Sequence, residues 1–174
     1  DLRAAGLLAM TVPGRYGGGE ASLTTFLRVL ETLAEGDGST AMAATMHIRV
    51  FGAEREAPTY SPEWFERFCR GAVDHGWLVN SAATEEGLGS PAGGGLPATI
   101  ATPLEDGSWR LHGRKTFTTM APALHFFVVM AQVAQSDAEA PPAIGNFVVY
   151  GDDPGVRIDE TWDTLGMRAT GSHD

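Results

Sequence analysis

The chain has 174 residues, of which 43% are hydrophobic and 20% are charged, the composition of an ordinary globular protein with one domain or two small ones. Its formal net charge of −10 would repel a nucleic acid, and the short basic run at residues 110–115 is too small to reverse that repulsion. Neither a signal peptide nor an apolar run long enough to span a bilayer is visible, so we expect a cytoplasmic protein with no nucleic-acid or membrane partner.

Helical patterns fill the first part of the chain. Apolar residues recur at i, i+3, i+4 and i+7 over residues 23–34, which predicts a helix with one buried face. An Ala- and Met-rich run over residues 40–51 predicts a second helix that stops at Gly52. The tripeptide Ser61-Pro62-Glu63, a cap followed by proline at the first helical position, opens a third helix that Gly76 closes.

The pattern changes to that of strands after residue 76. Apolar and small residues over 77–83 predict a strand, and two short runs flank the turn Asp106-Gly107 as a hairpin does. Further strands are predicted at residues 126–133, 144–150 and 155–158. Because helices come first and strands follow, the order predicts an α+β fold rather than alternating βαβ units. We expect a helical domain over residues 1–76 and a β domain over residues 77–174.

Two segments, residues 84–90 and 113–119, place small hydroxyl residues and free backbone amides at the ends of predicted strands. The hairpin between them would fold both strand ends toward one side of a sheet. That arrangement suits a planar, polar-edged ring with a phosphate tail better than it suits a metal or a nucleic acid.

Several residues in these segments have a plainer interpretation as well. The glycine-rich run 87–93 lacks the following helix that a Rossmann loop needs, so a phosphate cradle and a surface loop both remain open. Neighbours on a strand face opposite sides, so Glu85 and Glu86 are interpreted as charged turn residues rather than an acid–base pair. Residues 117–119 could present an aromatic face and a hydroxyl to a ring, or form an ordinary strand.

The remaining reactive side chains indicate no metal site. Cys69 is the only cysteine, which excludes a disulfide or cysteine-rich metal site within the chain, and its apolar helical surroundings predict a buried, inert thiol. The later histidines show no metal-ligand spacing. His47, in the middle of a predicted helix, is interpreted as a structural histidine at a helix–helix contact.

Read together, five motifs in order along nearly the whole chain resemble those of the acyl-CoA dehydrogenase family. They are Gly6-Leu7 with Val12-Pro13-Gly14-Arg15-Tyr16-Gly17-Gly18, Leu30-Glu31-Thr32-Leu33-Ala34 with Asp37-Gly38-Ser39, Thr84-Glu85 with Gly89-Ser90, Gly113-Arg114-Lys115-Thr116-Phe117-Thr118-Thr119, and Leu165-Gly166-Met167-Arg168-Ala169-Thr170-Gly171-Ser172. The resemblance implies a helical N-terminal domain and an antiparallel, β-barrel-like middle domain. It also implies a C-terminal four-helix bundle that is missing from this chain.

The resemblance implies FAD as the cofactor, and it suggests which residues hold the polar parts of FAD. Ala83 and Thr84 would hydrogen-bond the pyrimidine edge of the flavin. Gly89 and Ser90 would lie near the pyrophosphate, with Ser90 also at the entrance for the acyl-CoA substrate.

The same resemblance places three consecutive residues around the flavin ring. Phe117 would cover the ring where the family usually has Trp, and Thr118 and Thr119 would meet it near N5. Fixed N–H and O–H donors around the flavin would stabilise the negative charge that reduction brings.

The implied activity is α,β-dehydrogenation of an acyl-CoA thioester, a CH–CH oxidation of fatty acid metabolism with hydride transfer to N5. The implied partners are an acyl-CoA-like molecule, an electron-accepting flavoprotein and further copies of the chain in a homodimer or homotetramer. The family's glutamate base belongs to the missing bundle, so no catalytic residue is assigned within this chain.

Departures from the family pattern keep other functions open. Glu86 replaces the usual Pro, Pro91 the usual Asp and Phe117 the usual Trp, all in the expected flavin and substrate walls. The alternatives are a flavin-dependent monooxygenase of the same fold, which binds reduced flavin and activates oxygen, and a non-catalytic binding protein.

Overall fold

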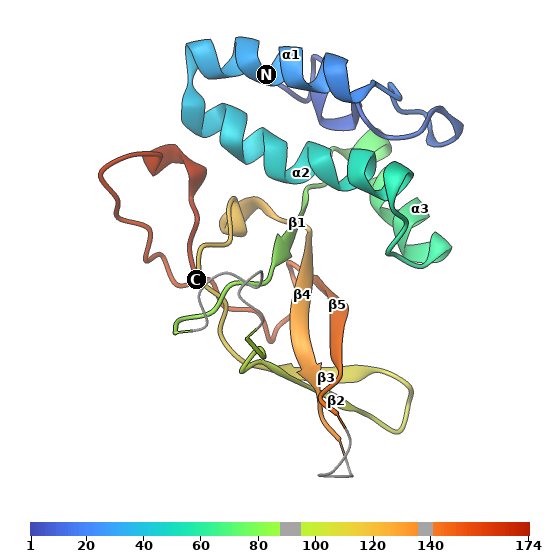
Figure 1. Ribbon diagram of the computed structural model, residues 1–174, viewed down its shortest axis with the longest axis vertical. Helices are drawn as coiled ribbons and strands as arrows, with labels where there is room; N and C mark the ends of the chain where they lie inside the picture. The colour runs from blue at the N-terminus through green and yellow to red at the C-terminus, as the bar shows by residue number, and fades with distance from the viewer. Residues whose placement is uncertain (88–94, 136–140) are drawn as a thin grey trace.

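Helices and strands form two separate parts of the molecule that pack against each other (Figure 1). The computed structural model describes residues 1–87, 95–135 and 141–174. Within these residues, no helix is both long and apolar enough to cross a membrane. All helices of the first part precede residue 76, and all strands follow it, so the expected α+β class is confirmed.

The first two helices are joined by a single residue, Asp37. Helix α1 (Leu23–Gly36) begins at Ser22, whose hydroxyl accepts the N–H of Thr25 at 3.2 Å, and α2 spans Gly38–Glu56. Asp37 has an extended backbone and accepts the first free N–H groups of α2, so it ends one helix and caps the next. Gly36 is the last residue of α1 but does not adopt the left-handed conformation in which a glycine often ends a helix.

Helix α2 also continues through Gly52, where a stop was expected. The helical cost of a glycine, about 1 kcal/mol, is outweighed by burial of the apolar side chains of Val50 and Phe51 before it. The Glu54 carboxylate accepts the N–H groups of Thr59 and Tyr60 beyond the helix end, which fixes the turn into the next helix.

Helix α3 (Pro62–Arg70) follows the sequence signals closely. Ser61 caps it by accepting the N–H of Trp64 at 3.3 Å, and a single π-helical turn, Gly71–His75, extends it. Gly76 ends this turn with a φ of 69°, a conformation that glycine adopts without a steric penalty. The predicted termination is confirmed.

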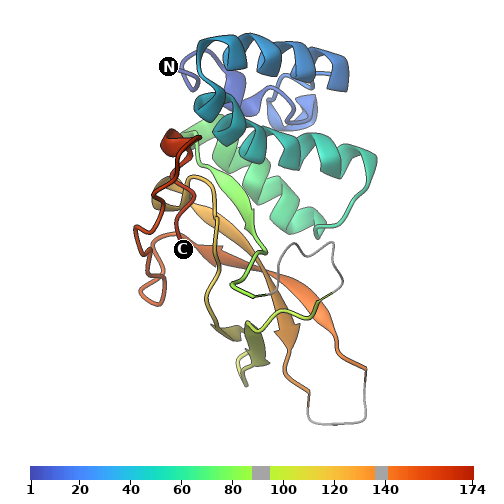
Figure 2. The same cartoon turned by 60° about the vertical axis from the view of Figure 1, so that its left-hand side comes forward.

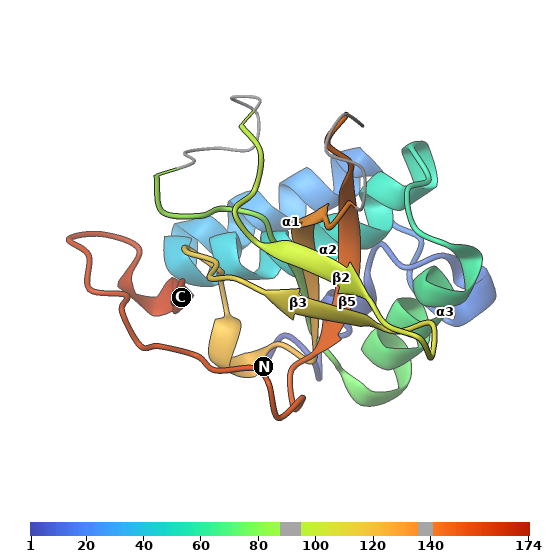
Figure 3. The same cartoon turned by 90° about the horizontal axis from the view of Figure 1, so that it is seen from below.

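In the part of the chain that the structure describes, five strands form one mixed sheet with β4 at its centre. They are β1 (Val79–Ala82), β2 (Ile100–Pro103), β3 (Trp109–His112), β4 (Phe126–Val133) and β5 (Ile144–Tyr150). Strands β2 and β3 form the predicted hairpin, and β5 runs antiparallel to β4 along seven residue pairs. The hairpin crosses the far ends of β4 and β5 (Figure 3).

Two features of the sheet differ from the expectation of a wholly antiparallel domain. Strands β1 and β2 both pair parallel with β4. A long connection separates each of them from β4, and it brings the chain back across the sheet so that β4 runs in the same direction. The strand predicted at residues 155–158 does not form, since Asp153 accepts the N–H groups of Gly155 and Val156 in a local turn. Val156 and Ile158 still pack against the apolar cluster on this side of the sheet.

A shared hydrophobic core joins the two parts. It takes residues from the N-terminal segment, from α2 and α3, and from β1 and β4: Val12, Val50, Phe51, Phe65, Phe68, Cys69, Ala72, Val79, Phe126 and Val128. The last segment of the chain adds a second connection, since η6 (Arg168–Thr170) returns to lie beside α2 (Figure 2).

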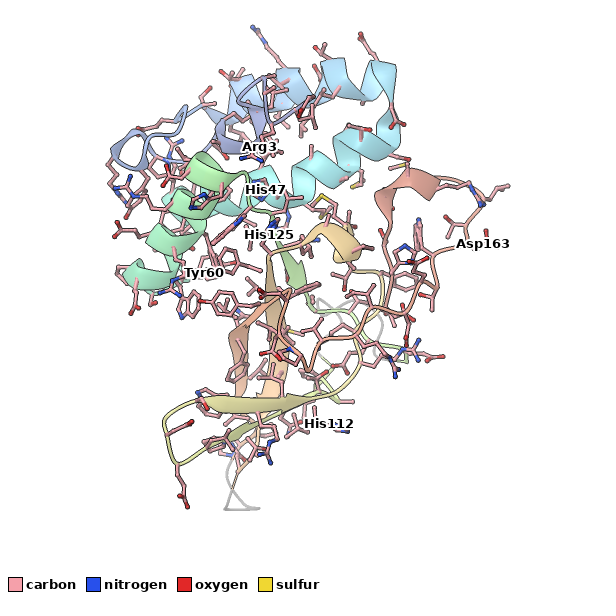
Figure 4. The ribbon with its side chains drawn as sticks, turned by 180° about the vertical axis from the view of Figure 1, so that it is seen from behind. Arg3, His47, Tyr60, His112, His125 and Asp163 are labelled. Carbon is pink, nitrogen blue, oxygen red and sulfur yellow. The ribbon has the colours of Figure 1, made fainter. Side chains whose placement is uncertain are left out.

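His47 lies fully buried at this junction (Figure 4). Its Nε2 donates to the carbonyl of Leu8 at 3.1 Å, and its Nδ1 accepts the N–H of Val79 at 3.1 Å. Burial lowers the pKa of His47 to about 4, so the ring is neutral at pH 7. The histidine is structural, as interpreted, although its partners are the backbones of the N-terminal segment and β1 rather than another helix.

We predict that stability falls as the pH drops from 6.5 to 4. The unfolded His47 binds a proton near pH 6.5 and the folded one only near pH 4, so the unfolded chain gains protons first. The loss is about 3 kcal/mol of unfolding free energy. His47→Gln retains a donor and an acceptor but cannot titrate, so urea unfolding at pH 7 and pH 5 should show a smaller pH dependence in this variant. Equal pH dependence in the two proteins would contradict the assignment.

Candidate functional site

The structure brings the end of β1 and residues 116–119 side by side. The carbonyl of Thr84 accepts the N–H of Thr116 at 2.9 Å, and the carbonyl of Thr119 accepts from Asn80 Nδ2 at 3.1 Å. Ala83 lies between these contacts and is half-buried. The expected flavin residues Ala83, Thr84, Phe117, Thr118 and Thr119 are thus neighbours. Gly89 and Ser90 lie outside the described residues.

Phe117 projects from this segment in a strained conformation. Its φ is 57°, in the left-handed region that a bulky side chain rarely adopts, and its side chain is 64% exposed. The ring has one aromatic neighbour, Trp162, which meets it edge-on with centroids 6.0 Å apart. A strained backbone that presents an aromatic ring to solvent is typical of a binding surface rather than of a folding requirement.

Thr118 and Thr119, in contrast, are buried. The N–H of Thr118 donates to the carbonyl of His173 at 3.0 Å in an isolated bridge, and the hydroxyl of Thr119 lies 3.0 Å from that of Ser172. Residues 117–119 are therefore no ordinary strand, which removes one of the two interpretations left open by the sequence. They pack against the end of the chain instead.

Glu85 is the main correction to the sequence interpretation of this region. It was expected to be an exposed turn residue, but only 5% of it is exposed, and its carboxylate forms an ion pair with Lys115 Nζ at 2.6 Å. The same carboxylate accepts from the N–H groups of Ala98 and Thr99 and from the Thr99 hydroxyl. Glu86 is an exposed turn residue, as expected.

These hydrogen bonds decide the charge of Glu85. Burial alone raises its pKa, but the bonds from Lys115, Thr99 and Ala98 outweigh this effect and lower the pKa of Glu85 to about 2. The pair is therefore charged at neutral pH. It joins the end of β1, the start of β2 and the segment that carries Phe117, which are distant in sequence.

Gly113 makes this close approach possible. A Cβ at that position would collide with the side chain and backbone of Thr99, which itself donates twice to Glu85. The glycine therefore lets the chain pass directly over β2 before Lys115 turns toward the carboxylate.

A cavity of about 650 Å³ lies on one face of the sheet, beneath residues 153–159. The residues that line it include apolar ones, among them Phe127, Val129 and Val149, as well as arginines and aspartates. Of the expected flavin residues that the structure describes, Thr118 lines it and the others do not. The exposed Phe117 ring therefore does not line the cavity, although its neighbours Lys115 and Thr118 do.

No cluster of metal ligands accompanies the site. In residues 1–87, 95–135 and 141–174, no group of three or more His, Cys, Asp or Glu side chains is arranged to hold a metal ion. Burial raises the pKa of the Cys69 thiol to about 12, which leaves it protonated and unreactive at neutral pH.

Two family models match the chain in sequence. Residues 1–56 match the N-terminal domain of acyl-CoA dehydrogenases, and residues 80–174 match their middle domain. The second match contains every expected flavin residue, including those that the structure does not describe.

Similarity to individual proteins extends over nearly the whole chain. "Putative acyl-CoA dehydrogenase YdbM" of Bacillus subtilis (strain 168) is 44% identical over 99% of the chain and 44% of its own length. The amino sugar nitrososynthase RubN8 of Streptomyces rubradiris is 35% identical over 97% of the chain and 39% of its own length. The chain therefore spans less than half of these relatives.

A solved structure resembles the fold closely. Dibenzothiophene monooxygenase TdsC from Paenibacillus sp. A11-2, in a complex with FMN and indole, superimposes with a TM-score of 0.84. It is 28% identical and covers 99% of this chain and 41% of the TdsC chain.

We predict that Lys115→Met destabilises the protein by about 3–5 kcal/mol, because it leaves the Glu85 carboxylate buried without its counter-charge. The matched control is Glu66→Gln, which breaks the exposed Arg70–Glu66 pair, whose side chains are 51% and 54% exposed. That change should cost less than about 1 kcal/mol. Urea unfolding at pH 7 measures both, and equal losses would contradict a central role for Glu85.

Proposed function

The chain belongs to the acyl-CoA dehydrogenase family, and from this premise we propose that it forms the flavin-binding wall of a flavin-dependent oxidoreductase. The observation that carries the proposal is the exposed, strained Phe117 ring beside the end of β1. We also propose that the chain divides at residue 76 into a helical and a β domain. The same proposal includes a cytoplasmic location and a homo-oligomeric state for the protein.

The residues present fit a flavin. A planar isoalloxazine ring could pack on the exposed face of Phe117, as aromatic rings do in proteins. Ala83 and Thr84 would hold its polar edge, and Thr118 and Thr119 would lie near N5. Gly89 and Ser90 are proposed for the phosphate end of the cofactor, with Ser90 also at the substrate entrance. When bound, the flavin supplies two-electron redox chemistry that no side chain provides.

The residues proposed here would contact the isoalloxazine ring of the cofactor, so they do not distinguish FAD from FMN. The sequence resemblance favours FAD, whereas the related TdsC was solved with FMN. Both cofactors carry the same isoalloxazine ring. We therefore propose FAD or FMN at this wall, to be distinguished by their relative affinities.

Between the two reactions expected for the family, we favour oxygen activation on a small organic molecule. Support comes from RubN8 and TdsC, whose names describe nitrososynthase and monooxygenase activities. The departures at Glu86, Pro91 and Phe117 from the thioester-oxidising pattern lie in the walls expected to face flavin and substrate. In this reaction one oxygen atom of O₂ enters the substrate and the other leaves as water, while reduced flavin supplies two electrons and two protons.

Dehydrogenation of an acyl-CoA thioester is the second candidate. It is supported by the 44% identity with the B. subtilis relative. This reaction needs a base that removes the α-proton, and no residue of the present chain is proposed for that role.

One pair of assays separates the candidates. The flavin-loaded protein is first titrated anaerobically with acyl-CoA thioesters of several lengths while the visible flavin absorbance is followed. It is then mixed with reduced FMN, indole and ¹⁸O₂, and products are analysed by mass. Incorporated ¹⁸O without bleaching supports oxygen activation, whereas bleaching by a thioester supports dehydrogenation. Neither result, in a protein that binds flavin, would support the non-catalytic alternative.

We predict that Phe117→Gly weakens FMN binding at least about tenfold by removing the aromatic surface, without loss of stability. Glycine accepts the left-handed backbone freely, so the unfolding free energy should stay equal or rise by up to about 1 kcal/mol. Phe117→Trp, which restores the family's usual residue, should bind at least as well as the wild type. Calorimetric FMN titration and urea unfolding measure the two effects.

The control for this prediction is Trp109→Ala on β3, which removes another exposed aromatic ring, one that packs on Phe147 and not on Phe117. It should leave FMN affinity unchanged. Unchanged affinity in Phe117→Gly as well would contradict the placement of the flavin.

A further inference from the structure

The sheet has a second apolar face, on the side away from the core that it shares with the helices. Successive side chains of a strand point to opposite faces. On β4, Phe126 and Val128 pack in the shared core, so Phe127 and Val129 point the other way. These two residues line the cavity of about 650 Å³, together with Val149 of β5. The cavity therefore lies over an apolar sheet face.

The segment 153–159 encloses this space together with the sheet. Its Val156 and Ile158 line the cavity and pack against the apolar cluster that contains Phe127. Leu111 of the hairpin strand β3 lines it as well. Pockets that hold small organic ligands have volumes of about 300–1,000 Å³ and mostly apolar walls. The cavity therefore has the size and the lining that suit an apolar molecule of about two fused rings.

Most charged residues that line the cavity are already paired. Arg114 forms ion pairs with Asp174 at 2.9 Å and with Asp159 at 3.7 Å. Arg157 forms a second pair with Asp159, at 2.9 Å. Lys115 is held by its buried ion pair with a carboxylate at 2.6 Å. An anionic ligand would face the two aspartates, and it would have to break one of these pairs to gain a cation.

Two further charged residues line the cavity, and neither favours an ion inside it. The carboxylate of Asp153 accepts the N–H of Gly155 at 2.8 Å. Arg110 lies on β3 and is exposed, so water and salt screen its charge. The charges around the cavity therefore favour a ligand that carries no charge itself.

We infer that this cavity is a binding site for a neutral, apolar small molecule, separate from the surface proposed for the flavin. The inference goes beyond the proposed function and does not depend on flavin binding. Phe117 does not line the cavity, whereas Lys115 and Thr118 on either side of it do. The flavin and this ligand would therefore contact the same short segment through different residues.

The test is calorimetric titration of the protein with 2-acetylnaphthalene, a neutral molecule of two fused rings. We expect one site with a dissociation constant on the order of 100 μM. The anion 2-naphthoate has the same rings but carries a carboxylate. It should bind at least about tenfold more weakly, because its charge would lose water without gaining an unpaired cation. Equal affinity for the two molecules would contradict the neutral class of ligand.

A cavity-filling variant shows where the molecule binds. Val149→Trp fills the cavity from β5, where an aromatic residue suits a strand, and it should weaken 2-acetylnaphthalene binding at least about tenfold. Val156→Trp fills it from the segment 153–159 if the first variant fails to fold, as judged by urea unfolding. The matched control is Ile144→Trp on the same strand, whose side chain is 48% exposed and does not line the cavity. This control should leave the affinity unchanged.

Two results would overturn the inference. One is unaltered affinity in a folded cavity-filling variant, and the other is a wild type that does not bind 2-acetylnaphthalene. Titration of the same wild-type protein with FMN reports on the proposed function separately, so failure of the one is distinguishable from failure of the other.

Discussion

The candidate site depends on one buried ion pair, that between Glu85 and Lys115. Removing two charges from water is costly, and such a pair is tolerated only where further hydrogen bonds satisfy the remaining lone pairs. Here the Glu85 carboxylate receives donors from Lys115, Ala98 and Thr99. These hydrogen bonds also fix the positions of the three segments that contribute Glu85, Thr99 and Lys115. They thereby position the segment that carries Phe117.

This anchoring explains how a strained residue is maintained. A left-handed Phe117 costs free energy that its own contacts do not return, because most of its ring faces solvent. The segment is fixed on both sides, by Lys115 before it and by the contacts of Thr118 and Thr119 with His173 and Ser172 after it. The fold therefore presents a rigid aromatic surface that is followed by two buried threonines, Thr118 and Thr119, which is the preorganisation that cofactor sites need.

Local signals in the sequence predicted most of the elements. Ser61 caps a helix, Asp106-Gly107 turns the hairpin, and Gly76 closes the helical part, because each effect acts within a few residues. We also predicted that the segments beginning at Thr84 and Gly113 meet, and the Thr84–Thr116 hydrogen bond confirms this for the residues that the structure describes.

The features that the sequence missed depend on distant partners. Glu85 is buried because Lys115, 30 residues away, neutralises it, and the Thr119 hydroxyl lies 3.0 Å from that of Ser172, 53 residues away. The parallel pairing of β1 with β4 depends likewise on the path of a long connection. The one available signal was that Glu85 and Lys115 both lie inside the motifs of the family resemblance.

The most direct test of the account is hydrogen–deuterium exchange of the protein with and without FMN. Flavin packed on the Phe117 ring should slow exchange at residues 84–87, 116–120 and 170–173, while the segment 153–159, which lines the cavity on the sheet, should be unchanged. Protection confined to residues 153–159 and β3 would place the flavin in the cavity instead and would contradict the central claim.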